Sequence, residues 1–250
     1  MRELWFDNLF AIERGDGHAV ILLHGGLATH VACAPIAEPL ARRVRVITPD
    51  LRGSGRSHDA GPLSWDQLAD DVAALARHVG IERAAIGGIS LGAGVAVRVA
   101  LRHPALVGAL VAIHPAFAGA DVGLTSAQAA AMRAIDAAGS RAPHEGVEVL
   151  LPLFDALPDD VRARARTLVA AYDPASVAAT ARFMLDGGQP FERGEDLRAI
   201  TAPAFVVPGI DPTHPAEVAE VYRRHLPHCT LAPDASTLGE FLDRALSSPR

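Results

Sequence analysis

The sequence predicts an α/β protein in which helices flank a mostly parallel β-sheet. Short, continuously apolar segments of about one strand's length alternate with longer segments whose apolar residues recur at helical spacing. Continuous apolar runs are typical of strands covered on both faces, and their alternation with helices indicates crossover connections between parallel strands. The chain has 250 residues, half of them apolar, so it is long enough to bury one large core.

A strand or hairpin arm is expected at Leu4–Glu13, and four further strands follow it in the first half of the chain. These strands are expected at Ala19–Leu23, Arg43–Thr48, Ile81–Gly88 and Leu106–Ile113. A helix is expected after Ser64, because Ser64 and Gln67 have the spacing of a capping box. A second helix follows the strand Ile81–Gly88 and stops before Pro104.

Residues 117–195 carry a different pattern, with helical segments broken by proline and glycine and no convincing strand. The helices are expected at Ser126–Ala138, Glu145–Phe154, Asp159–Tyr172 and Pro174–Leu185. The strand pattern then resumes, with strands at Ala204–Pro208 and His228–Ala232 and helices at Ala216–Leu226 and Thr237–Ala245. We therefore expect a core domain formed by residues 1–116 and 196–250, with residues 117–195 inserted as a helical lid.

Ser90 stands in the sequence Gly88-Ile89-Ser90-Leu91-Gly92, between a predicted strand and a predicted helix. A sharp turn from strand to helix strains the backbone of its central residue, and glycines two places to either side avoid collisions. The N-terminus of the following helix favours negative charge that develops nearby. The pattern predicts that Ser90 is a nucleophile. The alternative is a glycine-rich turn that happens to contain a serine.

The strand Ala19–Leu23 runs into His24-Gly25-Gly26-Leu27. Glycine lets the backbone approach a ligand closely, so the amides of this loop can point into a cleft. His24 is expected to order the loop through hydrogen bonds to the backbone. His24 and Leu27 are also placed among the residues that contact a substrate, together with His114, which directly follows a strand.

The order of these segments resembles that of the α/β-hydrolase superfamily, in particular its small esterase, enol-lactonase and C–C hydrolase branch. The resemblance rests on His24-Gly25-Gly26, the DLRGSGRS loop at 50–57, the Ser90 turn, the helical insertion and Gly209-Ile210-Asp211-Pro212. It implies that Ser90 is the nucleophile, that the amides of Gly26 and Leu91 form the oxyanion hole, and that Asp211 is the acid of a triad. It also implies that the lid sets substrate choice and that the 50–57 loop is structural.

The chain departs from this family at the general base, which is usually a histidine in the loop after the last strand. Pro233-Asp234-Ala235-Ser236 occupies that loop, and no histidine follows His228. We expect His214 to be the base, because it follows the strand Ala204–Pro208 at the cleft end and lies three residues beyond Asp211. His114 is the second candidate. The alternative role for His214 is a surface or helix-capping one.

Two classes of function are compatible with these residues. The first is a hydrolase that cleaves a carboxylic ester, thioester or lactone of a small apolar metabolite through Ser90, with an atypical base. The second is a protein that has lost the complete triad and acts as a lyase, a cyclase or a cofactor-free isomerase, or binds a ligand. The intact turn around Ser90 favours the first class, and the missing histidine favours the second.

Composition limits the partners that are expected. A net charge of −6 with no basic arm or stripe gives no reason to expect nucleic acid. No continuously apolar segment of 18 residues is present, and the two cysteines do not form a disulfide framework, so we expect a cytoplasmic protein with no membrane partner. No metal or cofactor is expected, because HExxH, CxxC and a glycine-rich phosphate loop are absent. A homodimer is left open.

Overall fold

Eight strands form one mostly parallel sheet in the computed structural model, which describes residues 1–58, 63–155 and 159–247. The strand order is β1-β2-β4-β3-β5-β6-β7-β8, with antiparallel pairing at β1–β2 and β2–β4 and parallel pairing from β4 to β8. The strands are β1 Arg2–Phe6, β2 Leu9–Arg14, β3 Ala19–Leu23, β4 Arg45–Pro49, β5 Ala84–Ile89, β6 Val107–Ile113, β7 Ala204–Val207 and β8 Cys229–Leu231. The predicted fold class is therefore confirmed.

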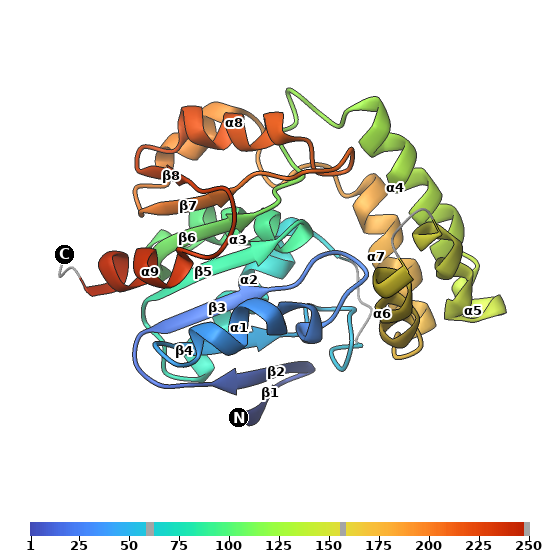
Figure 1. Cartoon of the computed structure of the whole chain (residues 1–250), viewed down its shortest axis with the longest axis horizontal. Helices are drawn as coiled ribbons and strands as arrows, with labels where there is room; N and C mark the ends of the chain where they lie inside the picture. Colours follow the sequence, from blue (N-terminus) through green and yellow to red (C-terminus); the bar gives the residue numbers. More distant parts are fainter. Residues whose placement is uncertain (59–62, 156–158, 248–250) are drawn as a thin grey trace.

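Helices cover both faces of the sheet (Figure 1). The helices α2 (Trp65–His78), α3 (Leu91–Arg102) and α8 (Ala216–His225) contribute to one apolar cluster, and α1 (Ala34–Leu40) and α9 (Leu238–Ser247) contribute to the other. Short 3-10 helices lie at His30–Cys33, Pro104–Leu106 and Gly194–Ala199. Among the described residues, no helix has both the length and the apolar character needed to cross a bilayer.

The element boundaries agree with the sequence pattern to within a few residues, and the differences have local causes. The segment Leu4–Glu13 is a hairpin of two strands, β1 and β2. Strand β5 begins at Ala84, because the amide of Ile81 still bonds the Ala76 carbonyl at the end of α2. Ser64 caps α2 by accepting from the Gln67 amide at 3.1 Å, whereas the Gln67 side chain donates to Asp71.

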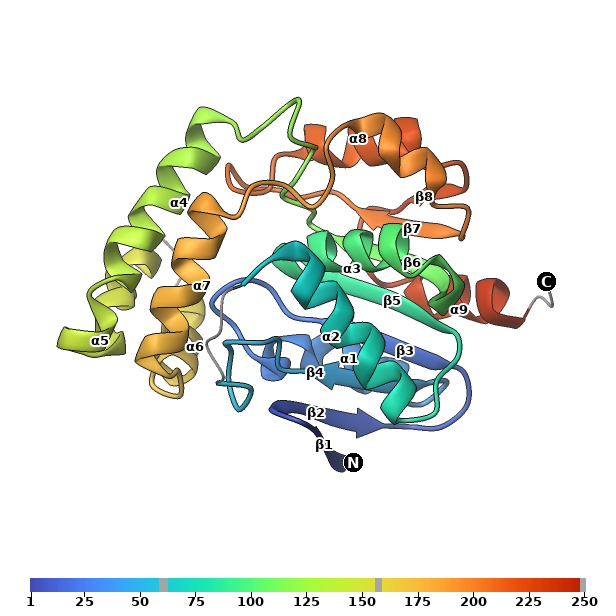
Figure 2. The ribbon, with the colours of Figure 1, turned by 180° about the vertical axis from the view of Figure 1, so that it is seen from behind.

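The helices of residues 117–195, which we call the helical insertion, gather at one end of the sheet in both views (Figures 1 and 2). They are α4 (Ser126–Gly139), α5 (Ala142–Glu145), a 3-10 helix at Val147–Phe154, α6 (Asp159–Val169) and α7 (Pro174–Asp186). The single helix expected at Glu145–Phe154 is wrong, because Gly146 has a φ of +90° and interrupts it. No strand lies in the described residues of this insertion.

The insertion has its own apolar cluster and contacts the loops that leave the sheet. Ala138, Leu150 and Val177 belong to this cluster, and Leu27 from the loop after β3 packs against it. The hydroxyl of Thr180 on α7 donates to the Gly53 carbonyl in the loop after β4. The insertion therefore lies against the carboxyl ends of the parallel strands, where ligands bind in open α/β sheets.

Candidate active site

Ser90 has a backbone conformation that residues other than glycine rarely adopt. Its φ is +55° and its ψ is −114°, and its amide bonds the Ile113 carbonyl at the end of β6 at 2.9 Å. A Cβ on Gly88 would lie 2.2 Å from the Gly92 carbonyl carbon, and a Cβ on Gly92 would lie 2.5 Å from the His24 carbonyl oxygen. Neither position can hold a side chain without a shift of the backbone. The two glycines thus permit the turn that presents Ser90 at the start of α3.

The structure brings Ser90, His214 and Asp211 into one hydrogen-bonded chain. The Nε2 atom of His214 lies 2.8 Å from Ser90 Oγ, and its Nδ1 atom lies 3.0 Å from Asp211 Oδ2 and 3.1 Å from Asp211 Oδ1. A proton on Nδ1 is donated to the carboxylate, which leaves Nε2 free to accept from the serine hydroxyl. This order of groups is that of a serine, a base and the residue that orients the base.

The loop after β7 folds back on itself to make this contact. The Asp211 carboxylate accepts from the Thr213 amide at 2.8 Å, from the Thr213 hydroxyl at 2.5 Å and from the His214 amide at 3.0 Å. A Cβ on Gly209 would lie 2.0 Å from the His214 carbonyl oxygen, so glycine is needed at the base of the loop. Asp211 therefore bonds both the ring of His214 and the amides before α8.

The charge of Asp211 is stabilised by these hydrogen bonds. Partial burial raises its pKa, but the bonds from the Thr213 hydroxyl and the His214 ring outweigh burial and lower the pKa to about 2. The carboxylate is therefore ionised at every pH at which an imidazole is neutral. An ionised acceptor is what an orienting residue needs, because it stabilises the imidazolium that forms when the base takes a proton.

The loop after β3 lies beside Ser90. A Cβ on Gly25 would be 3.5 Å from Ser90 Cβ, and a Cβ on Gly26 would be 2.4 Å from the sulfur of Met184 on α7. Leu27 has a φ of +49°, and its carbonyl accepts from the Tyr172 hydroxyl of the insertion. The amides of Gly26 and Leu91 remain the predicted oxyanion hole, and Met184 covers the first of these two residues.

The expectation that His24 contacts a substrate is corrected by the structure. His24 is 1% exposed, its Nδ1 lies 2.7 Å from the Gly25 carbonyl, and its Nε2 accepts from the Leu51 amide at 2.9 Å. Burial lowers its pKa, which keeps the ring neutral. Both ring nitrogens are thus used on the backbone, so His24 orders the loops after β3 and β4.

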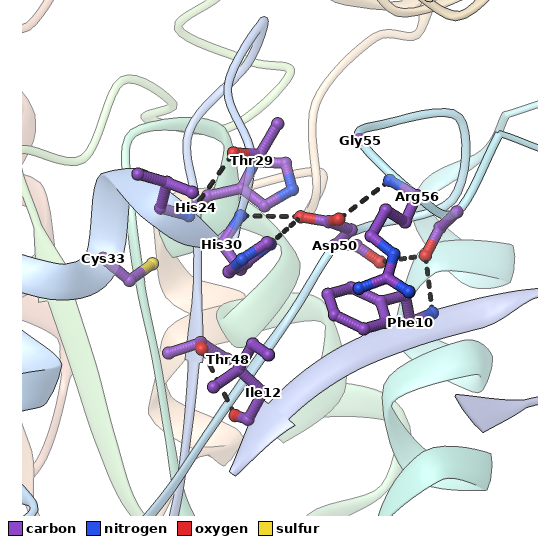
Figure 3. A network of polar contacts seen from close by, with 12 residues as sticks. Phe10, Ile12, His24, Thr29, His30, Cys33, Thr48, Asp50, Gly55 and Arg56 are labelled. Atoms are coloured by element: carbon purple, nitrogen blue, oxygen red, sulfur yellow. Dashed lines mark hydrogen bonds and ion pairs between the residues drawn. The ribbon is translucent and has the colours of Figure 1, made fainter. Parts of the chain in front are cut away.

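The loop at residues 50–57 is held by a buried carboxylate (Figure 3). Asp50 is fully buried and accepts from the His30 amide at 2.7 Å, from His30 Nδ1 at 2.8 Å and from the Arg56 amide at 2.9 Å. Burial raises the pKa of Asp50, but these bonds outweigh it and lower the pKa. Arg52 donates to Asp71 on α2 through two nitrogens. These contacts give the loop a structural role and leave Asp50 engaged away from Ser90.

His114, the second candidate for the base, lies near His214 with ring centroids 6.3 Å apart. Its φ is +48°, and its amide bonds the Val207 carbonyl at the end of β7. Burial and the nearby His214 lower its pKa, so its ring is neutral around pH 7. It is His214 that the structure places on the Ser90 hydroxyl. A substrate contact by His114 stays a prediction, as does one by Leu27.

Three residues that adjoin this site were not predicted from the sequence. Thr213 bonds Asp211, Met184 covers Gly26, and Gln128 on α4 bonds the Thr213 carbonyl. A signal existed for Gln128, because Thr125 and Gln128 have the capping-box spacing. Within the described ranges, His, Cys, Asp and Glu side chains do not gather in threes as metal ligands would.

The fold and this geometry define an α/β-hydrolase-type protein, and comparison with known sequences agrees. The family described as the alpha/beta hydrolase fold matches residues 18–236, so the chain belongs to this family. Among solved structures, an esterase from Exiguobacterium antarcticum matches with a TM-score of 0.77 at 19% identity, covering 96% of each chain. The enol-lactonase from Burkholderia xenovorans matches with a TM-score of 0.75 at 18% identity, covering 99% of this chain and 100% of its own. These likenesses concern the fold.

Curated relatives match over shorter segments. RutD of Caulobacter segnis, whose name assigns it carbamate hydrolysis, is 37% identical over 101 residues, which are 39% of this chain and 38% of its own. The pimeloyl-[acyl-carrier protein] methyl ester esterase of Aliivibrio salmonicida is 33% identical over 106 residues, 42% of this chain and 39% of its own. The matched segments therefore span about two fifths of these curated relatives.

Proposed function

We propose that the protein is a serine hydrolase that cleaves a carboxylic ester, thioester or lactone of a small apolar molecule. One observation carries the proposal, the hydrogen-bonded chain from Ser90 Oγ through the His214 ring to the Asp211 carboxylate. A serine is a weak nucleophile unless a base removes its proton, and here an imidazole nitrogen lies within hydrogen-bond reach of the hydroxyl. In this proposal the histidine after β7 replaces the one that is absent after β8.

The reaction proceeds in two halves. Ser90 Oγ attacks the substrate carbonyl carbon while His214 Nε2 takes the hydroxyl proton, and Asp211 stabilises the resulting imidazolium. The amides of Gly26 and Leu91 donate to the oxygen of the tetrahedral intermediate, which forms beside the N-terminus of α3. His214 then gives its proton to the leaving oxygen or sulfur, and an acyl-enzyme remains. Water, activated by His214, releases the acid in the second half.

The helical insertion is the proposed lid of this site. It carries apolar side chains toward the loop after β3, since Leu27 packs on its cluster and Met184 lies against Gly26. An apolar wall beside the oxyanion glycine favours an apolar acyl group and keeps water from the charges that develop. The ester and carbamate named for two relatives are both carbonyl substrates, which supports the reaction class.

The first test is Ser90→Ala, assayed with p-nitrophenyl acetate and p-nitrophenyl butyrate beside a fluorophosphonate probe. We expect wild type to be labelled and the variant to be unlabelled, with turnover reduced by about 10⁶-fold, because loss of a triad nucleophile removes the whole covalent pathway. Turnover that survives in the variant would place the activity elsewhere. A folded wild type that neither labels nor hydrolyses either ester would favour a lyase, cyclase, isomerase or binding role instead.

A further inference from the structure

Gln128 is a buried polar residue of the helical insertion that bonds three backbone groups. Its side chain is on the first turn of α4 and is 1% exposed. Its Nε2 donates to the Ala116 carbonyl at 2.7 Å and to the Thr213 carbonyl at 3.1 Å, and its Oε1 accepts from the Thr125 amide at 3.0 Å. The amide group therefore joins three segments, namely the chain after β6, the start of α4 and the loop after β7.

The bond to Thr213 matters because Thr213 lies between Asp211 and His214. The loop is poorly buried, since the Asp211 side chain is 47% exposed. The hydrogen bonds that Asp211 accepts come from Thr213 and His214, within the same loop. Bonds within the loop fix its shape but do not fix its place relative to Ser90. The Gln128 bond connects the middle of the loop to a buried side chain of another element, 85 residues away in sequence.

The alternative is that Gln128 only caps α4. Its Oε1 does serve as half of a capping box, with the Thr125 hydroxyl accepting from the Gln128 amide at 3.2 Å. A capping role uses that oxygen alone, however, and leaves the two bonds from Nε2 unexplained. Leaving a buried carbonyl without a hydrogen-bond donor costs free energy. The two bonds from Nε2 therefore restrict the positions of the Ala116 and Thr213 carbonyls.

We propose that Gln128 is a positioning residue for the base, holding the loop of Asp211 and His214 so that His214 Nε2 remains within reach of Ser90 Oγ. The inference rests on the proposed serine-hydrolase function. Gln128 touches no reacting atom and acts through the Thr213 carbonyl. Displacing a catalytic group by about 1 Å can lower a rate by about 100-fold, so even a small movement of this loop would be measurable.

The test compares Gln128→Met and Gln128→Glu with Thr125→Ala. Methionine fills similar space without a donor, and glutamate keeps the acceptor for Thr125 while it replaces the amino group with an oxygen. Thr125→Ala removes the hydroxyl cap of the same helix and keeps both Nε2 bonds. We expect both Gln128 variants to lose about 10-fold to 100-fold in kcat and in the rate of fluorophosphonate labelling, with KM changed little, because the base is displaced while the pocket is kept.

Thermal unfolding identifies the variants that fold, and either Gln128 variant is sufficient for the test. A labelling rate within twofold of wild type in a folded Gln128 variant would overturn the inference, and so would an equal loss in Thr125→Ala, which would indicate helix stability alone. These outcomes require a wild type that labels at Ser90. A wild type that does not label would overturn the proposed function itself, so the two failures are distinguishable.

Discussion

The loops after β7 and β8 leave adjacent parallel strands at the same edge of the sheet, and they contain the same local turn. In both loops an aspartate Oδ1 accepts from the backbone amide two residues further on, at 2.8 Å. The pairs are Asp211 with Thr213 and Asp234 with Ser236. The loops differ in the residues beyond this turn. The β7 loop adds His214, whose ring reaches Ser90 at 2.8 Å, whereas the β8 loop continues into α9 without a histidine. The same turn chemistry therefore occurs in a candidate catalytic loop and in a loop that contains no histidine.

Replacing the histidine of the β7 loop is expected to have the largest effect. In His214→Ala the Ser90 hydroxyl loses its base, so kcat for a p-nitrophenyl ester should fall by about 10⁶-fold, and fluorophosphonate labelling should be lost. The matched controls are His228→Ala, an exposed histidine just before β8, and His114→Asn. Asparagine tolerates the positive φ of position 114. Both controls should still label. Loss of labelling in His114→Asn alone would move the base to the loop after β6.

Replacing the aspartate should lower kcat much more in the β7 loop than in the β8 loop, although the loss should be smaller than that of His214→Ala. Asp211→Asn leaves the serine and the imidazole in place but removes the charge that orients the ring, so we expect kcat to fall by about 10⁴-fold. Asp234→Asn alters the equivalent turn of the β8 loop and should change kcat by less than twofold. Similar losses in the two variants, measured with the same ester, would mean that the two turns have the same role.

The smallest expected effect is on stability in acid. The folded-state pKa of Asp211 is depressed to about 2, so this carboxylate stabilises the fold above its unfolded pKa of about 4, and that contribution is lost as the pH falls toward 2. Chemical denaturation at pH 6 and pH 3 should show a smaller decrease for Asp211→Asn than for wild type. Hydrogen bonds from Ser236 also lower the pKa of Asp234, but Asp234 is fully exposed, so Asp234→Asn should follow wild type more closely. If Asp234→Asn lost less stability between pH 6 and pH 3 than Asp211→Asn, the hydrogen bonds of the Asp211 carboxylate would not stabilise the fold as described.

Much of the fold and part of the site can be predicted from local pattern. The apolar runs predict the strands of the sheet, and Gly88 and Gly92 predict the turn at Ser90, because each feature depends on neighbouring residues. The place of His214 after a strand likewise predicts that it stands at the cleft end. Its contact with Ser90 cannot be predicted in this way, because it depends on how far the loop folds back above Gly209.

Other features depend on groups far apart in the sequence. The bond from Gln128 to Thr213 joins the insertion to the β7 loop, and the spacing of Thr125 and Gln128 indicates only the helix cap. The contact between Met184 and Gly26 is similar, since α7 and the loop after β3 are separated by most of the chain. The place of His24 in its loop predicts that the ring bonds the backbone, as it does at Gly25, but its second partner, the Leu51 amide, meets the ring only in the folded protein.

The confinement of Asp211 and His214 to one turn has a consequence for how related genes are classified. A search that requires a histidine after the final strand would sort this chain with inactive homologues, although Ser90, His214 and Asp211 form one hydrogen-bonded chain. The pattern Gly-x-Asp-x-x-His after the penultimate strand is short enough to be recognised in a single sequence. Family members that carry it, and that lack the usual histidine, form a group whose enzymatic status can be examined together.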